Sequence, residues 1–430
     1  MTQPFRLGIA GLGTVGAGVV KIVQQHGNLL AERAGRPIEI VSVSARDRNK
    51  DRGVDLSGYA WVDNPEGLAD GNNIDAVVEM IGGQEGAALT LARKALGKGL
   101  SVITANKAML AHHGFELAAL AEDNGASLSY EAAVAGGIPI IKALREGFAG
   151  NEIQAVLGIL NGTCNYILSE MRETGRDFGD VLKDAQALGY AEADPAFDIE
   201  GIDAGHKLCL LSAIAFGTKP DFANLQIKGI TQISATDIEK ATELGYRIKL
   251  LGIARRVNGK VLQILEPCLV PSNSTLGAVE GVYNAVMVEG DFVNSGISVG
   301  RGAGAGPTAS AVMSDIIDLA RGLKVPTFGI PANDLKTPSW IDIGETYSSY
   351  YLRLNVLDKS GVIADVSAIL RDHNISIESL IQHGRDPDQP VSVVMTTHET
   401  RHADMADACK LIHESGVTLD APCLMRIEEL

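Results

Sequence analysis

The sequence predicts an α/β protein built from a doubly wound parallel sheet, a following α+β domain and a C-terminal ferredoxin-like domain. Residues 5–130 alternate short apolar runs with longer amphipathic segments, which is the pattern of parallel strands joined by crossover helices. Longer helical segments then mix with strand-like runs such as EIQAVLGIL and VLQILEPCLV until about residue 300. From residue 349 the patterns follow the order strand, helix, strand, strand, helix, strand.

These patterns divide the chain into three domains and one connector. The segment 296–322 starts with GISVGRGAGAG, which predicts a glycine-rich loop, and continues into a helix opened by Pro307 and Thr308. We expect this helix to complete the first domain. The predicted boundaries are 1–135 for the first domain with about 305–330 completing it, 136–304 for the second, 331–348 for a Pro-rich connector and 349–430 for the last.

Composition excludes several classes of partner. A net charge of −16 and a pI near 5.0 argue against nucleic acid, since binding to its phosphates needs clustered Lys and Arg. The longest apolar runs are too short to span a bilayer, and MTQPFRLGIAGLG lacks the pattern of a cleavable leader. The 5 cysteines are scattered singly, without a CxxC pair. We therefore expect a cytoplasmic protein with neither nucleic-acid nor membrane partners.

The string GLGTVG follows an apolar strand and opens a helical stretch, which is the context of a Rossmann-like dinucleotide site. Gly11 permits the tight turn, Gly13 lets the backbone approach a pyrophosphate, and Gly16 allows the helix to lie close to the strand. Thr14 and Val15 then belong to the helix N-terminus that faces the phosphates. The alternative is a glycine turn that serves packing alone.

The end of the second strand favours NADP(H) over NAD(H). An NAD site usually offers an acidic residue there, whereas IEIVSVSARDRNK ends in Arg46, Arg48 and Lys50. Arginine pairs with phosphate through two hydrogen bonds, so Arg46 is the candidate for the 2′-phosphate. Asp47 and Asp51 lie nearby, so a solvated loop and NAD use stay open.

Two lysines are candidates for chemistry. Lys107 lies where the strand LSVITA gives way to a helix, at the sheet edge where ligands of such folds bind. Lys207 lies in IDAGHKLCLLSAIAF, which predicts a helix with Asp203 in its first turn and on the same face. Glu192 and Asp198 precede this helix in a loop expected to rim a cleft. An ordinary surface lysine and an exposed helical ion pair are the alternatives.

Five segments together resemble one enzyme family. GLGTVG, TANK, NGTCNYI, GYAEADPAFDIEGIDAGHK and GRGAGAGPTASAV follow one another as in homoserine dehydrogenases, and the match spans residues 1 to about 345. This resemblance implies reversible NAD(P)-dependent interconversion of L-homoserine and L-aspartate 4-semialdehyde, a step towards threonine, methionine and isoleucine. The alternatives are a catalytically inactive dinucleotide-binding sensor of amino acids and a dehydrogenase for another semialdehyde or amino acid.

The resemblance also implies roles for single residues. Glu192 and Asp198 would bind substrate, Asp203 would orient the substrate hydroxyl or a water, Lys207 would act as acid and base, and Lys107 would contact nicotinamide and substrate. Gly304 of GRGAGAG joins the coenzyme site, and one departure from the family pattern, Ala193 in AEADP, touches no proposed ligand.

The resemblance also implies a monovalent cation site, for Na⁺, in YEAAVAGGIPI. The matching oxygen donors are those of Glu131, Val134, Gly136 and Ile138. Hard oxygen ligands suit such an ion, although the segment alone fits a plain turn equally well.

The C-terminal residues resemble an ACT domain, a small-ligand sensing module. In LDKSGVIADV we expect Asp358, Gly361 and Val362 to hold an amino-acid effector, with threonine as the expected ligand. A dimerisation module without a ligand is the alternative, and either reading predicts a homodimer or homotetramer.

HETRH in this tail fits the zinc-hydrolase pattern H-E-x-x-H. The strand VSVVMTT runs directly into it and a helix is expected only near Ala403, so the two histidines should not share a helical face. We do not expect zinc.

Overall fold

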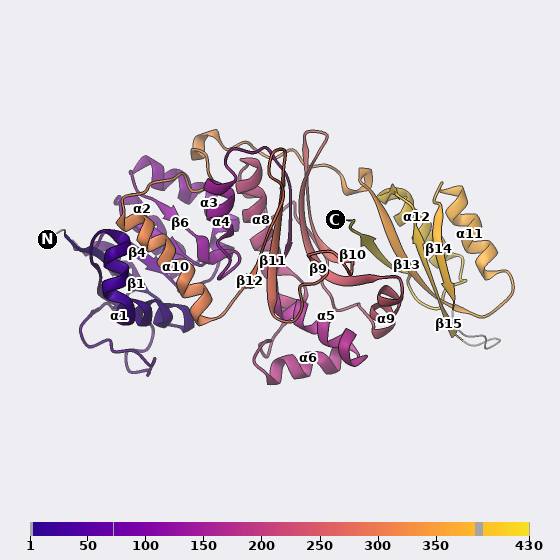
Figure 1. Ribbon diagram of the computed structural model, residues 1–430, viewed down its shortest axis with the longest axis horizontal. Coiled ribbons are helices and arrows are strands. Elements are labelled where there is room, and N and C mark those ends of the chain that lie inside the picture. The colour runs from indigo at the N-terminus through magenta and orange to yellow at the C-terminus, as the bar shows by residue number, and fades with distance from the viewer. Residues whose placement is uncertain (1–2, 72, 383–389, 430) are drawn as a thin grey trace.

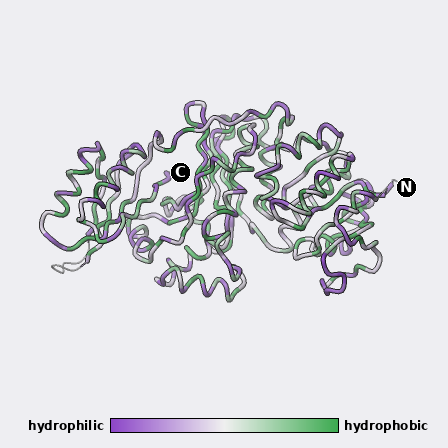
Figure 2. Tube along the Cα trace, turned by 180° about the vertical axis from the view of Figure 1, so that it is seen from behind, coloured by the Kyte–Doolittle hydropathy of each residue, from purple (hydrophilic) through white to green (hydrophobic). Residues whose placement is uncertain are grey.

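The computed structural model describes residues 3–71, 73–382 and 390–429. Three parts lie in a row along the long axis, from the N-terminal domain through a central sheet to the C-terminal domain (Figure 1). Hydrophobic and hydrophilic stretches alternate along the outer helices, as helices with one face on a sheet require (Figure 2). None of the helices in the described ranges combines the length and apolarity needed to cross a membrane.

The N-terminal sheet is parallel and confirms the predicted doubly wound plan. Its strand order is β3-β2-β1-β4-β5-β6, which reverses between β1 and β4 and so opens a crevice beyond the carboxyl ends of these strands. The strands are β1 (Phe5–Ala10), β2 (Ile38–Ser44), β3 (Ala60–Trp61), β4 (Ala76–Glu79), β5 (Ser101–Thr104) and β6 (Leu128–Ser129). The helices that connect them include a short 3₁₀ turn, and are α1 (Thr14–Ala34), η1 (Pro65–Asp70), α2 (Ala87–Gly97) and α3 (Lys107–Asp123).

Helix α10 (Ala305–Ala320) returns to this sheet after the central domain. Its Ala309, Val312 and Ile316 share one apolar cluster with Ile9 of β1 and Val19 of α1. Gly18 permits the close approach of the two helices, because a Cβ there would lie 3.0 Å from the Cβ of Ala309. The N-terminal core is therefore closed by a helix that is nearly 300 residues away in sequence.

The central domain is a sheet with the order β12-β11-β7-β9-β10, and all four of its neighbouring pairs are antiparallel. Its strands are β7 (Ile153–Ile159), β9 (Tyr246–Val257), β10 (Lys260–Pro271), β11 (Tyr283–Gly290) and β12 (Asn294–Arg301), with the short β8 (Gln226–Ile227) beside β10. Its helical elements are η2 (Glu131–Ala133), α4 (Ile140–Lys142), η3 (Ala143–Gly147), α5 (Gly162–Thr174), α6 (Phe178–Ala187), α7 (Ala196–Ile199), α8 (Ile202–Phe216) and α9 (Ala235–Glu243).

The prediction of a glycine-rich loop from residue 296 was wrong for its first part. Residues 294–301 form β12, whose full length pairs with β11. In this register Ile297 lies opposite Met287 and Val299 lies opposite Ala285. These apolar residues at alternate positions favour the strand more than the glycines between them disfavour it. The loop proper is confined to residues 302–304.

The C-terminal domain confirms the ferredoxin-like plan, since its strand order is β17-β13-β15-β14. The 3₁₀ turns η4 (Ala332–Asp334) and η5 (Ile343–Glu345) precede it, and β13 begins at Tyr347, inside the predicted connector. Its elements are β13 (Tyr347–Leu357), α11 (Val362–Asp372), β14 (Ile377–Gln382), β15 (Pro390–Thr397), β16 (Thr400–Arg401), α12 (His402–Glu414) and β17 (Cys423–Ile427). Helix α12 starts at the second histidine of HETRH, which bonds the Tyr350 hydroxyl at 2.9 Å, so His398 and His402 do not share a helical face.

The C-terminal and central sheets form one continuous sheet. Strand β17 pairs in parallel with β10, where Cys268 faces Arg426 and Leu269 faces Ile427. A second connection is polar: the fully buried carboxylate of Asp237 on α9 accepts hydrogen bonds from Tyr351 (3.1 Å) and from Arg353 of β13 (2.6 Å). The C-terminal domain is therefore held to the central one by backbone pairing and by a buried ion pair.

We predict that Arg353→Met destabilises the native protein by about 3–5 kcal/mol, because it leaves the Asp237 carboxylate buried without its cation. Urea unfolding followed by circular dichroism measures the change. Arg371→Met is the matched control, since Arg371 pairs with Asp372 on the same domain but is 73% exposed. Equal effects of the two substitutions would contradict the docking role of the buried pair.

Candidate functional site

Two lysines and one carboxylate from different elements meet at the carboxyl edge of the N-terminal sheet. Lys207 lies one turn after Asp203 on α8, and its Nζ is 2.7 Å from Asp203 Oδ2. Lys107, the first residue of α3, places its Nζ 3.1 Å from Asp203 Oδ1. Asp203 and Lys207 are each only 7% exposed, so the alternative of an exposed helical ion pair does not hold.

Local sequence explains how these side chains are aimed. Gly201, with φ of 85°, reverses the chain into α8, and Gly205 lets the helix lie against β8, because a Cβ there would be 2.7 Å from Ile227 Cδ1. Asn106 caps α3 by accepting the Met109 amide at 3.1 Å, and its own amide donates to Gly83 O at 2.7 Å. Both helices therefore enter the crevice in fixed orientations.

The electrostatics of the cluster keep Asp203 ionised. Burial alone raises the pKa of this carboxyl, but the charges of Lys207 and Lys107 and their hydrogen bonds outweigh burial and hold the pKa well below its usual range. Lys207 Nζ also donates to Leu160 O at 2.8 Å, so the ammonium has a neutral partner beside its carboxylate. The arrangement can deliver or take up a proton at an oxygen placed against Lys207.

The predicted acidic residues occupy different positions. Asp198 on α7 is half-buried and joins the cluster through Asn161, whose Nδ2 donates to Asp198 Oδ1 at 2.8 Å and to Asp203 Oδ2 at 3.0 Å. Glu192 is exposed in the loop before α7, and within the described part of the chain no side-chain contact joins it to the cluster. The structure thus brings together Lys107, Asp198, Asp203 and Lys207, and leaves Glu192 at the rim.

Asn161 is the functional candidate that the sequence reasoning missed. It is the second residue after β7 and caps α5 by accepting the Cys164 amide at 2.8 Å. The signal was present in NGTCNYI, where an Asn stands between an apolar strand and a helix, at the strand end where ligands of α/β folds gather.

A neutral histidine lies next to Lys207 in the sequence of α8. His206, between Asp203 and Lys207 in sequence, is 4% exposed and its ring lies 4.3 Å from the Phe222 ring. Burial, and then the neighbouring His112, lower the pKa of His206 to about 4. The imidazole therefore adds no positive charge to the two lysines near neutral pH.

The GLGTVG loop has the shape of a phosphate cradle. Gly11 has a φ of 94°, and a Cβ on it would lie 2.4 Å from Met80 O. A Cβ on Gly16 would lie 1.9 Å from Gly11 O, whereas a Cβ on Gly13 would meet no atom within 4 Å. Thr14 and Val15 are the first two residues of α1. The amides of this helix N-terminus therefore lie next to the unfilled space beside Gly13.

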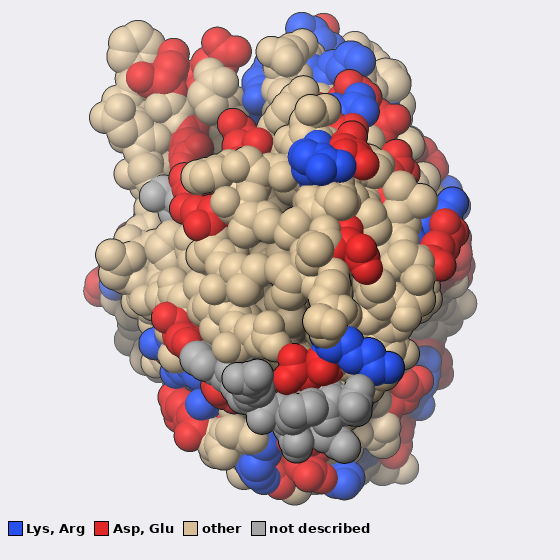
Figure 3. Space-filling model, turned by 90° about the vertical axis from the view of Figure 1, so that its right-hand side faces the viewer, with Lys and Arg blue, Asp and Glu red and all other residues tan. Residues whose placement is uncertain are grey.

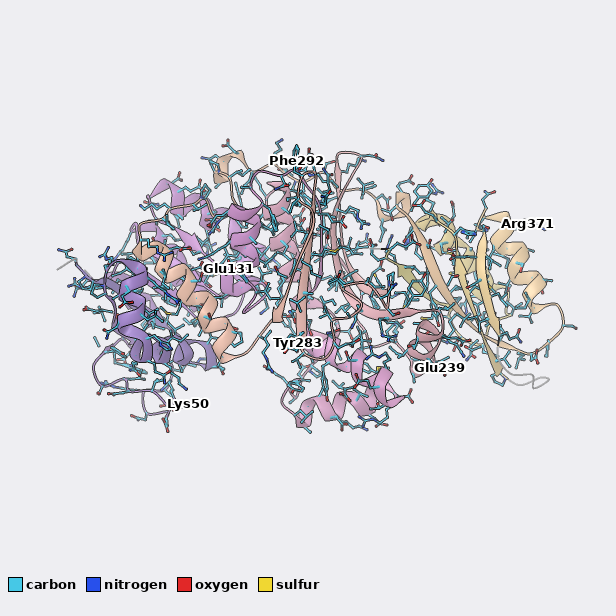
Figure 4. All side chains as sticks on the ribbon, in the orientation of Figure 1. Lys50, Glu131, Glu239, Tyr283, Phe292 and Arg371 are labelled. Carbon is cyan, nitrogen blue, oxygen red and sulfur yellow. The ribbon has the colours of Figure 1, made fainter. Side chains whose placement is uncertain are left out.

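Beside this loop lies the cationic end of β2. Arg46, Arg48 and Lys50 are exposed, and Lys50 stands at the outer edge of the N-terminal domain (Figure 4). Arg52, which the sequence reasoning did not single out, donates from Nε to Leu12 O at 3.1 Å and so ties this loop to the glycine loop. The Asp47 carboxylate accepts the Asn49 amide at 2.8 Å, so one of the nearby acids is engaged locally.

The segment predicted to hold a cation is buried between the N-terminal and central domains, where Glu131 lies (Figure 4). The Glu131 carboxylate accepts the amides of Ile141 (2.9 Å) and Lys142 (2.8 Å), and Ile138 O accepts the Ile140 amide at 2.8 Å. Burial and then Asp315 raise the pKa of Glu131 to about 7. Gly136 has a φ of 55°, and a Cβ there would lie 2.4 Å from Gly302 O.

The carboxylate and carbonyl groups of this segment are hard oxygen ligands. Each oxygen has a lone pair that its hydrogen bond does not use, which fits a monovalent cation. The described residues contain no group of three or more His, Cys, Asp and Glu side chains placed for a metal, so any cation here would rely mainly on carbonyls. Gly304, with φ of 110°, lies close by at the start of α10 and accepts the Thr308 amide at 3.2 Å.

The loop predicted to hold an effector joins β13 to α11. Gly361, with φ of 99°, precedes Val362 at the helix start, and Gly361 O accepts the Asp365 amide at 2.9 Å. Asp358 is partly buried just after β13. Gly361 is exposed and Val362 is partly buried at this helix start.

Comparison with known proteins places this geometry in a family. The chain matches the family models "Homoserine dehydrogenase" over residues 139–317, "Homoserine dehydrogenase, NAD binding domain" over 11–131, and "ACT domain" over 350–415. A homoserine dehydrogenase of Neisseria gonorrhoeae is 43% identical over 434 residues, covering 100% of this chain and 99% of the relative.

Solved structures similar to this chain are homoserine dehydrogenases as well. The homoserine dehydrogenase of Thiobacillus denitrificans is 42% identical with a TM-score of 0.94, covering 99% of each chain. A hyperthermophilic archaeal homoserine dehydrogenase in complex with NADPH is 27% identical with a TM-score of 0.64, covering 75% of this chain and 99% of the other.

Two glycines of the cradle should respond differently to the same substitution. Gly13→Ala is expected to leave thermal stability without coenzyme unchanged and to abolish the stabilisation by NADPH, because the added methyl enters only the open side. Gly16→Ala should lower the stability of the free protein, because its methyl meets the Gly11 carbonyl. Thermal unfolding with and without NADPH distinguishes them, and an NADPH-induced shift retained by Gly13→Ala would contradict the cradle.

Proposed function

The chain belongs to the homoserine dehydrogenase family, and we propose that the Lys107–Asp203–Lys207 cluster is where this oxidoreductase carries out its reaction on a CH–OH group. The substrates that follow are L-homoserine and L-aspartate 4-semialdehyde. The observation that carries the proposal is the buried Asp203 carboxylate held between two lysines that come from different domains. A sensor without activity is not favoured, because such a cluster has no use in coenzyme binding alone.

The residues have distinct proposed roles in the reduction. When bound, NADP(H) supplies the hydride that the aldehyde carbon accepts. Lys207 donates a proton from Nζ to the alkoxide oxygen, and Lys107 stabilises the charge that develops there. Asp203 keeps both ammonium groups oriented, and Leu160 O holds the Lys207 side chain in place. In the oxidation of homoserine, Lys207 takes up the hydroxyl proton.

Substrate selection is proposed for the carboxylates. The ammonium group of an amino acid needs a negative partner, and the candidates are Asp198 within the cluster and Glu192, which is exposed in the loop before α7. Glu192 is free of side-chain contacts among the described residues, so it can turn towards a bound substrate.

NADP(H) is the proposed coenzyme, and NAD(H) the alternative. The open side of Gly13 and the cationic residues after β2 support a dinucleotide with a 2′-phosphate near Arg46. Lys107 and Gly304 are proposed to contact its nicotinamide half. The complex of the archaeal relative with NADPH supports the same choice.

We also propose that Na⁺ binds to oxygens of Glu131, Val134, Gly136 and Ile138. The left-handed turn at Gly136 and the burial of this segment beside Gly302 support it, since a cation here would brace the junction of two domains. Activity measured with Na⁺ replaced by a bulky organic cation tests this role.

The C-terminal domain is an ACT domain, and threonine is its proposed effector at Asp358, Gly361 and Val362.

The outer surface of this domain has uncharged residues over most of its centre and charged residues towards its margin (Figure 3). Partly exposed apolar residues of α11 lie there, and Leu380 of β14 is 43% exposed. Such a surface suits contact with a second copy of the domain.

A homodimer or homotetramer is proposed. The edge strand β12 pairs only with β11 in the described chain, and Val299 on it is 52% exposed, so this edge is open to a second copy. Two exposed aromatic residues lie at opposite ends of the same sheet, Tyr283 (45% exposed) and Phe292 (82% exposed) (Figure 4).

A cytoplasmic location is proposed as well. It fits the five free cysteines in the described ranges.

Removal of the proposed acid/base tests the mechanism. We expect Lys207→Met to lower kcat for L-homoserine oxidation by about 10²–10⁴-fold, because the proton has no acceptor in the transition state. Formation of reduced nicotinamide is followed by absorbance with NADP⁺ and with NAD⁺, and the ratio of the two kcat/KM values also reports coenzyme preference.

The control for this experiment is Lys410→Met, whose side chain is 72% exposed on α12. The wild type, Lys207→Met and Lys410→Met should bind NADPH equally well, as measured by the quenching of tryptophan fluorescence. Turnover by Lys207→Met at the wild-type rate would remove Lys207 from the chemistry, and absence of turnover in the wild type would remove the proposed reaction.

Threonine should stabilise the native protein if the ACT domain binds it. At 100 times the Kd, a ligand of the native state adds about 2.7 kcal/mol, which raises the thermal midpoint by several degrees. We expect Asp358→Ala to lose this shift, and Asp372→Ala, at the exposed end of α11, to keep it. An unchanged midpoint of the wild type at high threonine would favour a module that only dimerises.

A further inference from the structure

Asn161 occupies a position where one side chain contacts every acidic member of the cluster. Its two amide hydrogens are both used, one on Asp198 Oδ1 (2.8 Å) and one on Asp203 Oδ2 (3.0 Å). Its carbonyl oxygen accepts the Cys164 amide at 2.8 Å. Asn161 is 5% exposed, and both polar atoms of its side chain have protein partners.

The residue before it completes the arrangement. Leu160 O accepts a hydrogen bond from Lys207 Nζ, and this Nζ also bonds the oxygen of Asp203 that Asn161 contacts. Two consecutive residues at the end of β7 thus hold both members of the Lys207–Asp203 pair, one through the backbone and one through the side chain. A rigid strand end therefore sets the position of groups that lie on α8.

We propose that Asn161 is a positioning residue of the reaction, holding Asp198 and Asp203 side by side as two separate, correctly oriented carboxylates for the substrate. Both carboxylates need a donor between them, because two like charges that share a buried site otherwise favour a common proton. An amide is the side chain that donates two hydrogen bonds and carries no charge. The inference rests on the proposed function, since it assumes that the cluster performs the chemistry.

The charge balance around Asp198 supports this role. Burial raises the pKa of Asp198, and the hydrogen bond from Asn161 opposes that rise most strongly. The other groups that face it are Asp203 and Lys207 of α8, Lys107 of α3 and the Cys164 thiol of α5, whose Sγ donates to the Asp198 backbone oxygen at 3.2 Å. Removal of the amide therefore favours the protonated form of Asp198, which offers no negative charge to a substrate ammonium.

Two substitutions separate this role from helix capping. Ser and Asp are as effective as Asn at a helix N-cap, so Asn161→Ser and Asn161→Asp keep the cap of α5, whereas Asn161→Ala removes it. We expect kcat/KM for L-homoserine to fall by about 10- to 100-fold in Asn161→Ser. The acidic limb of its pH profile should move to higher pH, and further in Asn161→Asp, where a third carboxylate is added.

The matched control is Asn151→Ser. Like Asn161, Asn151 accepts from a backbone amide, that of Val293, but it donates to the Phe148 backbone oxygen instead of a carboxylate and lies at the opposite end of β7. It should keep the wild-type kcat/KM and pH profile. Thermal unfolding and NADPH binding, measured in every variant, should change little in Asn161→Ser.

The outcomes are distinct. A normal pH profile and normal kcat/KM in Asn161→Ser and Asn161→Asp, with lower stability only in Asn161→Ala, would overturn the proposal and leave Asn161 as a cap. A shifted acidic limb in both variants, with unchanged NADPH binding, supports it. If wild-type protein does not oxidise homoserine, the proposed function fails first, and the variants do not bear on that failure.

Discussion

The structure of the site depends on one buried carboxylate. Transfer of Asp203 out of water costs several kcal/mol, and the folded protein offsets this by bringing Lys207 and Lys107 to its two oxygens and by a hydrogen bond from Asn161. Lys107 comes from the N-terminal domain and Lys207 from the central one. The two domains must therefore meet in a fixed geometry at this cluster, and the apolar core that both share holds them there.

The same helix links this contact to the rest of the chain. Gly201 lets α8 approach β10, because a Cβ there would lie 2.8 Å from Leu265 Cδ2, and four residues farther along β10 the backbone pairs with β17 of the ACT domain. The short β8 supplies Ile227 to the same face of α8. Strand β10 thus contacts both the ACT domain and α8, and Asp237 and Arg353 form a second connection between the ACT and central domains.

Sequence patterns predicted local elements well and contacts between elements less well. The i,i+4 spacing of Asp203 and Lys207 and the strand-to-helix position of Lys107 followed from periodicity, but their meeting depends on how two domains pack, which no local pattern contains. Asn161 was missed because its cap signal looks like any other cap. The β12 strand was missed because glycine is rare in strands, and only its pairing with β11 compensates. Motifs that resemble a family supplied what periodicity could not, above all the proposed role of Glu192, whose side chain makes no hydrogen bond or ion pair among the described residues.

A second buried carboxylate shows why the cations matter. Glu131 is as buried as Asp203, but its neighbours are Asp315 and two backbone amides, with Lys142 as the main positive charge nearby. Burial therefore prevails and raises the pKa of Glu131 to about 7, whereas the pKa of Asp203 is lowered. The difference lies in the number of cations: Asp203 has two, whereas Glu131 shares Lys142 with Asp315 and Asp318. The proposed sodium ion beside Glu131 would supply the missing positive charge, as the second lysine does for Asp203.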